Sequence, residues 1–265
     1  MPWISAFEYA KATGVMNTHT AHPADSPAAL IRLQDICFAY PGGKVVLDHL
    51  DFTLRKGDRI GLVAPNGSGK TTLFHIIMGL IRPDAGHIEI FGRAVKEEKD
   101  FVAVRQRIGM LFQDADDQLF SPTVLEDVAF GPLNMGKSKD EAISVSRRVL
   151  ARLGLEAFEN RITYKLSGGE KRLVALATVL SMEPEVLLLD EPTSGLDERT
   201  KQRLKDILRT LDLSYILISH EFDFMADTVT AFYTLRDGKI VIDSDLHHHE
   251  HAHSHPLGRQ PHDHP

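Results

Sequence analysis

The feature that most constrains the fold is a glycine-rich loop between a buried strand and a helix. The continuous apolar run RIGLV at 59–63 is typical of a strand buried on both faces, and the spacing of TTLFHIIMGL at 71–80 predicts a helix. Between them lies PNGSGK at 65–70. Glycines let backbone N–H groups curl around an anion, and a helix N-terminus adds a positive dipole. The loop therefore predicts a phosphate site in an α/β fold.

The side chains of this loop suit a nucleoside triphosphate and Mg²⁺. Lys70 is placed to reach the terminal phosphates, and the Thr71 hydroxyl to coordinate Mg²⁺. The other residues expected at the phosphates are Asn66, Gly67, Ser68, Gly69 and Thr72. The strict pattern G-x-x-x-x-G-K-S/T fails at its first glycine, where Ala64 stands, so we expect no positive φ there. The alternative is an ordinary glycine turn.

Strands that alternate with helices along the rest of the chain predict a parallel core sheet. Further buried strands are expected at 108–112, 186–190 and 215–219, and a mostly helical region at about 114–182. Before the glycine loop, two β-like runs separated by the turn PGGK predict a small antiparallel sheet.

Polar side chains follow several of these strands. The run VLLLDE ends in Asp190 and Glu191, which would divide the work because neighbouring strand residues point different ways. Asp190 would hold Mg²⁺ and Glu191 would activate the attacking water; the alternative is two acids capping a helix. Gln113 and His220 also follow apolar runs, where ligands gather in parallel sheets, but either also suits a merely hydrogen-bonded polar residue.

A second helix start is marked by LSGGE at 166–170, in which Ser167 and Glu170 have the spacing of a capping box. Its free N–H groups, with Gly168 and Gly169 allowing close approach, would form a second phosphate-binding end. The alternative is a plain helix cap. Tyr40, just before PGG, would either stack on a base or only pack.

Taken in order, these motifs resemble the motif set of an ABC-transporter nucleotide-binding domain over about 30–243. The resemblance implies a P-loop (RecA-like) ABC ATPase core of the α/β class, with an antiparallel β subdomain and a helical subdomain. It also implies ATP and Mg²⁺ as cofactors. Two copies would pair head to tail, with the phosphate loop of one copy facing the LSGGE serine of the other. Glu170 departs from the family, which often has glutamine there.

The same resemblance implies individual roles for the site residues. Tyr40 would stack on adenine, and Gln113 would sense both Mg²⁺ and the membrane partner. Glu191 would be the catalytic base, and His220 would contact the γ-phosphate. Asp197 would lie in the loop that contacts the second copy.

The segment at 112–136, FQDADDQLFSPTVLEDVAFGPLNMG, is more specific. It is similar to the Gln-loop region of energy-coupling-factor importers, particularly the ATPase components of nickel and cobalt systems. In those systems this surface receives an arginine-containing coupling helix from an integral membrane subunit. We therefore expect Asp114, Asp116 and Asp117 near the docking groove, since acids complement arginines; the alternative is a solvated acidic loop.

Histidine is the unusual part of the composition, with 14 copies, of which eight fall in the last nineteen residues. Imidazole is a ligand for Ni²⁺, Co²⁺, Cu²⁺ and Zn²⁺, so this end is a candidate for metal handling. An affinity tag and a solubilising tail are the other interpretations. The candidate ligands are His247, His248, His249, His251, His253 and His255.

The remaining composition excludes several classes of protein. No apolar run approaches the roughly 18 residues of a membrane span, and the first residues lack the pattern of a secretory signal. A net charge of −7 without a basic run argues against nucleic-acid binding. Cys37, the single cysteine, indicates a reducing compartment and a thiol in the core. An arm is expected at 1–29 and a His-rich tail at 244–265.

We therefore expect a homodimeric ATPase, peripheral at the cytoplasmic face of the membrane. It would power uptake of nickel or cobalt through separate membrane subunits. The rivals are the energy-coupling ATPase of a vitamin importer, a soluble ABC ATPase acting on nucleic acid or ribosomes, and a metal-storage protein in which the tail is the function.

Overall fold

The computed structural model describes residues 28–242. Most of the expected arm at 1–29 and all of the expected tail at 244–265, including its six candidate metal-binding histidines, lie outside the described residues. Within 28–242, no helix is both long enough and apolar enough to cross a bilayer.

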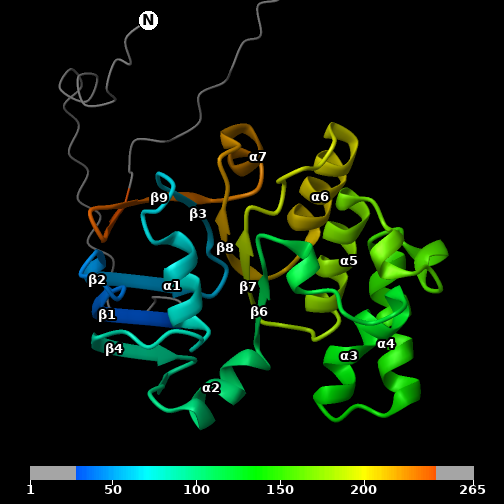
Figure 1. Ribbon diagram of the computed structural model, residues 1–265, viewed down its shortest axis with the longest axis horizontal. Coiled ribbons are helices and arrows are strands. Elements are labelled where there is room, and N and C mark those ends of the chain that lie inside the picture. Colours follow the sequence, from blue (N-terminus) through cyan, green and yellow to red (C-terminus); the bar gives the residue numbers. More distant parts are fainter. Residues whose placement is uncertain (1–27, 243–265) are drawn as a thin grey trace, which may run out of the picture.

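Two sheets organise the described chain (Figure 1). The smaller one is antiparallel, with the order β2-β1-β4-β5. The larger one has the order β10-β9-β3-β8-β7-β6 and is parallel except for the β9–β10 pair. The strands are β1 (Ala29–Ala39), β2 (Val45–Arg55), β3 (Arg59–Val63), β4 (Ala85–Ile90), β5 (Arg93–Ala94), β6 (Ile108–Leu111), β7 (Val186–Asp190), β8 (Ser214–Ile218), β9 (Ala231–Arg236) and β10 (Lys239–Ile242). The expected parallel core and antiparallel sheet are both confirmed.

Helices pack on both sides of the parallel sheet and form a separate group at one end of the molecule (Figure 1). They are α1 (Lys70–Ile77), α2 (Glu98–Arg105), α3 (Val124–Asn134), α4 (Lys139–Arg152), α5 (Gly168–Leu180), α6 (Glu198–Thr210) and α7 (Phe222–Ala226), with short 3-10 turns at η1 (Ala115–Asp117), η2 (Glu156–Phe158) and η3 (Thr163–Lys165). Capping boxes begin α3, α4 and α5, as the spacing of Ser138 with Glu141 and of Ser167 with Glu170 predicts for the last two.

The central strands are continuous apolar runs because both of their faces are covered. Every residue of β6, β7 and β8 is buried. In β7, Leu188 joins the core that contains α1 and the antiparallel sheet, whereas Leu187 and Leu189 join the core beneath α5 and α6. Burial of such side chains stabilises the sheet by roughly 1.5–3 kcal/mol each.

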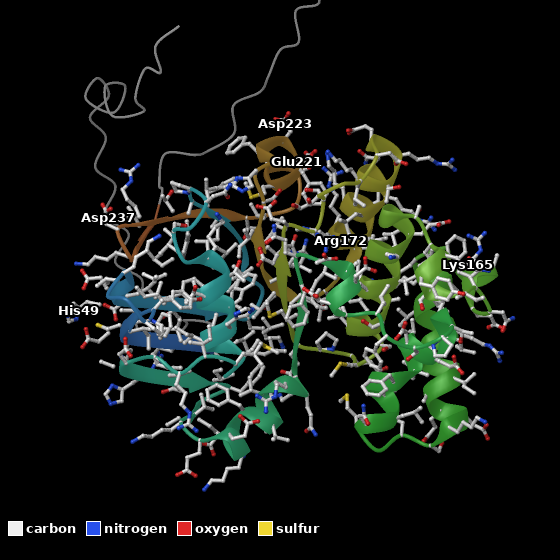
Figure 2. All side chains as sticks on the ribbon, viewed as in Figure 1. His49, Lys165, Arg172, Glu221, Asp223 and Asp237 are labelled. Atoms are coloured by element: carbon white, nitrogen blue, oxygen red, sulfur yellow. The ribbon has the colours of Figure 1, made fainter. Side chains whose placement is uncertain are left out.

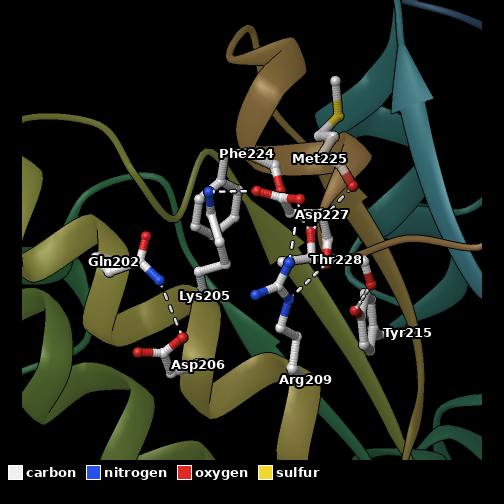
Figure 3. A network of polar contacts seen from close by, with 9 residues as sticks. All are labelled: Gln202, Lys205, Asp206, Arg209, Tyr215, Phe224, Met225, Asp227 and Thr228. Atoms are coloured by element: carbon white, nitrogen blue, oxygen red, sulfur yellow. Dashed lines mark hydrogen bonds and ion pairs between the residues drawn. The ribbon is translucent and has the colours of Figure 1, made fainter. Parts of the chain in front are cut away.

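A network of polar contacts holds α7 against α6 (Figure 3). Lys205 Nζ lies 2.6 Å from Asp227 Oδ2, and Arg209 Nε donates to the Asp227 carbonyl at 2.9 Å. The Tyr215 hydroxyl of β8 donates to the carbonyl of Thr228. Because His220 lies between β8 and α7, this network fixes the segment that carries it.

The expectation that Cys37 is a core thiol is wrong. Its neighbours Ile36 and Phe38 are buried, but Cys37 itself is only half-buried. Alternation along β1 places Cys37 on the opposite face from these two residues, and an antiparallel sheet commonly has one face open to water. The thiol therefore lies at the surface of the small sheet.

Candidate active site

A cavity of about 540 Å³ opens where four parallel strands end. The glycine loop follows β3, Gln113 follows β6, Asp190 and Glu191 end β7, and His220 follows β8. The lining residues are Tyr40, Lys44, Val46, Asn66, Gly67, Gly69, Lys70, Thr71, Thr72, Gln113, Asp190, Glu191, Ser194 and His220. Residues predicted from separate motifs thus meet at one site, since the carboxyl ends of parallel strands lie at one edge of a sheet.

The loop needs its glycine at the start of α1. Gly69 has a φ of 103°, and a Cβ there would lie 2.4 Å from a methyl carbon of Val46. Ala64 has no positive φ, as we expected for an alanine in place of the first glycine. The Ser68 hydroxyl is buried without a hydrogen-bond partner among the described residues, and Ser68 lines an adjoining cavity rather than the main one. The loop therefore contains one buried hydroxyl, that of Ser68, which is free to bind a ligand.

Lys70 lies beneath this loop and is almost fully buried. Its Nζ donates to the carbonyls of Ala64 at 2.7 Å and Pro65 at 3.1 Å. Burial lowers the pKa of Lys70, while Glu191 and Asp190 act in the opposite direction. The ammonium group is thus held in place at the floor of the cavity.

Thr71 and Asp190 place a hydroxyl and a carboxylate beside it. The Thr71 hydroxyl donates to Asp190 Oδ2 at 2.7 Å. Burial raises the pKa of Asp190, and the hydrogen bond from Thr71 opposes that shift. A hydroxyl, a carboxylate and the amide of nearby Gln113 are hard oxygen donors of the kind that Mg²⁺ takes, so the donor set fits this ion.

Glu191 lies next to His220 in the cavity lining. Its Oε1 is 3.1 Å from His220 Nε2, and its Oε2 accepts the His220 backbone N–H at 3.3 Å. Burial raises the pKa of the Glu191 carboxyl, whereas the nearby His220 lowers it. Such a shift brings a carboxylate closer to the range useful for a general base.

Asp190 and Glu191 contact different partners, but not for the reason that the sequence suggested. Strand alternation does not apply, because β7 ends at Asp190 and Glu191 has a φ of 47°. Its N–H donates to the Ile218 carbonyl at 2.9 Å, and its carbonyl accepts a bond from Arg172 at 2.6 Å. A left-handed residue at the strand end therefore aims the carboxylate.

The LSGGE segment does not reach this cavity within one chain. Ser167 and Gly168 are exposed at the start of α5. The Ser167 hydroxyl accepts the Glu170 N–H at 3.3 Å, and Glu170 Oε2 accepts the Ser167 N–H at 2.8 Å. Gly169 lies against Leu196 rather than against the glycine loop. In the single chain, this segment therefore acts as the helix cap that was the alternative interpretation.

Sequence reasoning missed two residues of the site and one that supports it. Lys44 and Val46 line the cavity, as does Ser194, which belongs to the same motif as Asp197. Arg172 of α5 is buried, and Figure 2 shows it near the centre of the molecule. It donates to the carbonyls of Phe112 at 2.7 Å and of Glu191, which fixes the segments before Gln113 and around Glu191. Arg172 follows two other charged residues, Glu170 and Lys171, so the sequence before the apolar run at 173–180 does not single it out.

A glycine loop after a parallel strand, with a lysine and a threonine at the start of the next helix and two acids at the end of another parallel strand, defines a P-loop nucleotide-binding ATPase. The ABC transporter family model matches residues 47–194. The chain is 52% identical to a protein of Nitratidesulfovibrio vulgaris provisionally assigned as an ABC transporter ATP-binding protein, over 89% of this chain and 86% of that one. It is 41% identical to the energy-coupling factor transporter ATP-binding protein EcfA of Methanocaldococcus jannaschii, over 80% of this chain and 77% of that one.

Two solved structures are also similar. The structure of cbiO1 from Clostridium perfringens, part of the ABC transporter complex cbiONQ, has a TM-score of 0.73 and 32% identity, and the match covers 81% of this chain and 87% of that one. A dimeric ATP-binding cassette with ADP and Pi has a TM-score of 0.72 and 25% identity, and the match covers 79% of this chain and 96% of that one. The chain belongs to the ABC transporter family, whose domains bind ATP. It is an ATP-binding subunit, an ATPase coupled to transport.

Proposed function

We propose that this chain powers uptake of a divalent transition metal, nickel or cobalt, as the ATPase of an energy-coupling importer. It would act at the cytoplasmic face of the membrane through separate membrane subunits. Similarity to EcfA and to a part of the cbiONQ complex supports the importer type. The segment at 112–136 and the histidines after 246 favour a metal over a vitamin. The ATPase itself rests on one observation, the cavity that joins the glycine loop to Asp190 and Glu191.

Within the cavity, we assign the binding of ATP to the loop and its neighbours. Tyr40 would stack on the base; its hydroxyl is 3.0 Å from Thr72 Oγ1, which orients it beside the loop. Loop N–H groups and Lys70 would hold the phosphates. Thr71, Asp190 and Gln113 would hold Mg²⁺, which when bound supplies positive charge to the phosphate oxygens.

Hydrolysis requires a positioned water molecule. Glu191 would accept a proton from this water as it attacks the γ-phosphorus, and the bond from that phosphorus to the bridging oxygen of ADP breaks. ADP and inorganic phosphate are the products. His220, held 3.1 Å from Glu191, would donate to the γ-phosphate and stabilise the charge that develops there.

A second copy would complete the site. Ser167, Gly168 and Gly169 are too far from the cavity to line it in one chain, yet Ser167 and Gly168 are exposed at a helix start that suits an anion. The related cassette with ADP and Pi is dimeric. A head-to-tail pair would bring this segment to the nucleotide of the partner, with Asp197, exposed at the start of α6, near the contact.

The surface beside Gln113 has the character of a docking site for a membrane subunit. Asp114, Asp116 and Asp117 are all exposed there. Phe120 follows them closely in sequence and Phe130 lies in α3; both rings are exposed and pack edge to face with centroids 4.6 Å apart. Exposed apolar side chains flanked by acids suit a partner helix with apolar residues and arginines.

Reversing two of these charges should weaken assembly. We expect the double variant Asp116→Lys and Asp117→Lys to bind the membrane subunits at least about tenfold more weakly, because like charges would face the arginines. Asp114 is left intact because it caps η1. Asp116 also pairs with Lys171 Nζ at 2.5 Å, so the single variant Asp117→Lys separates the loss of this pair from the loss of docking. The measurement is the affinity for membrane subunits in detergent or nanodiscs, together with ATP binding, which should not change.

The matched control reverses two exposed acids elsewhere, Glu156→Lys and Asp212→Lys. These substitutions give the same change in net charge away from the proposed surface. Equal affinity in both double variants would show that the surface at 114–117 does not receive the partner.

The transport proposal is tested by uptake in a reconstituted complex of this chain with its membrane subunits. We expect labelled Ni²⁺ or Co²⁺ to enter vesicles only when ATP is supplied. Uptake of a vitamin, with no metal uptake, would overturn the substrate and favour the rival importer. A chain that copurifies with ribosomes and with no membrane protein would overturn the importer itself.

A further inference from the structure

A mixed cluster of metal-binding side chains lies on the small antiparallel sheet, outside the nucleotide cavity. Asp35 and Cys37 come from β1 and His49 from β2. One ligand atom from each of these three residues lies within 4.8 Å of the other two. Figure 2 shows His49 at the outer edge of this sheet. The nucleotide site uses none of the three residues.

Irregular pairing of β1 with β2 brings these side chains together. The register shifts between Leu33 and Ile36, and again between Ile36 and Phe38. Asp35 and His49 both have positive φ, at 56° and 50°. This conformation is uncommon for residues other than glycine, although aspartate and histidine adopt it more often than most. As a result, both side chains lie beside Cys37.

The contacts within the cluster resemble those of a ligand set. His49 Nδ1 lies 2.5 Å from Asp35 Oδ1, so a single proton bridges two atoms that can each bind a metal. The His49 backbone N–H lies 3.4 Å from Cys37 Sγ, which accepts a hydrogen bond from it. Sulfur that accepts a backbone N–H bond is a common feature of metal-bound thiolates.

Two further carboxylates, Asp51 and Asp48, lie next to the cluster. Asp51 Oδ1 accepts the Asp35 backbone N–H at 2.9 Å and so fixes the position of that ligand. Asp48 Oδ1 is 3.9 Å from His49 Nε2, the ring nitrogen that does not face Asp35. A carboxylate near the second ring nitrogen orients a metal-bound histidine and raises its basicity.

We propose that Asp35, Cys37 and His49 form a site for a divalent transition metal ion such as Zn²⁺, Co²⁺ or Ni²⁺, with water as a further ligand. A thiolate with an imidazole and a carboxylate suits these borderline ions and disfavours Mg²⁺, which takes oxygen ligands. On binding, the Cys37 thiol releases its proton to solvent. The bridging proton leaves His49 Nδ1, the imidazole stays neutral with its proton on Nε2, and each ligand gives a lone pair to the metal. The site is independent of the proposed transport substrate.

The single cysteine makes the site directly observable. Since the chain contains one Cys, a thiolate-to-cobalt charge-transfer band can arise from Cys37 alone, whatever else Co²⁺ binds. We expect titration of the full-length, reduced protein with Co²⁺ to produce this band. Zn²⁺ should abolish it by displacement, because zinc binds such sites more tightly than cobalt, and excess Mg²⁺ should leave it unchanged.

Two variants test the ligands that the band does not report. Asp35→Asn and His49→Asn keep a residue that tolerates positive φ, and each should weaken Co²⁺ binding at this band by at least about tenfold. His87→Asn, at an exposed histidine on the neighbouring strand β4, is the matched control and should have no effect. Normal ATP binding by each variant shows that the protein is folded.

Two results would overturn the proposal. One is Co²⁺ binding to the full-length chain with no charge-transfer band, which would put the metal elsewhere, such as on the C-terminal histidines. The other is a band whose cobalt affinity is the same in the wild type, Asp35→Asn and His49→Asn, which would mean that Cys37 binds cobalt without these two residues.

Discussion

The Glu191→Gln variant should bind ATP with near-normal affinity and lose nearly all turnover, with kcat reduced by about 10²- to 10⁴-fold. Glutamine keeps the size of the side chain and a carbonyl oxygen near His220, so the cavity wall persists. It is unable to accept the proton of the attacking water. ATP bound between two copies should hold them together until it is hydrolysed, so this variant should also accumulate as a stable dimer with ATP. Single-turnover hydrolysis and size-exclusion chromatography with ATP measure the two effects.

The matched control for this result is Glu221→Gln. Glu221 lies directly after His220, but its carboxylate pairs with Lys201 Nζ at 2.6 Å and does not line the cavity. Its variant should hydrolyse ATP at the wild-type rate. If Glu191→Gln also did so, Glu191 would not be the base, and the dimer would have no reason to persist.

Much of the fold follows from patterns that act over short distances. A strand covered on both faces must be apolar throughout, which is why the runs that form β3, β7 and β8 could be recognised without knowledge of their partners. The helix starts at Ser138 and Ser167 could be recognised because a capping box is complete within four residues. Gln113 then lies near Asp190 and Glu191 because parallel strands end at the same edge of a sheet.

The features that sequence reasoning missed depend on contacts between distant residues. Arg172 fixes Glu191 by donating to its backbone carbonyl. Every residue has such a carbonyl, so the residue types alone do not reveal this contact. Cys37 meets His49 only because β1 and β2 pair with shifted register, and alternation along either strand alone does not reveal that shift. Ser167 does not line the cavity of its own chain, and in the proposed head-to-tail pair it would face the nucleotide of the other copy.

Replacement of Lys70 by alanine should weaken nucleotide binding strongly while leaving the fold intact. The ammonium group bonds the carbonyls of Ala64 and Pro65 from beneath the loop, so its charge is already positioned before ATP arrives. A hydrogen bond to a charged group contributes about 1.5–3 kcal/mol, so one lost phosphate contact weakens ATP binding about 10- to 150-fold. Lys44 also lines the cavity but is exposed, so Lys44→Ala should cost less. Calorimetry with a non-hydrolysable ATP analogue compares both variants; equal affinities for Lys70→Ala and the wild type would remove Lys70 from the phosphate site.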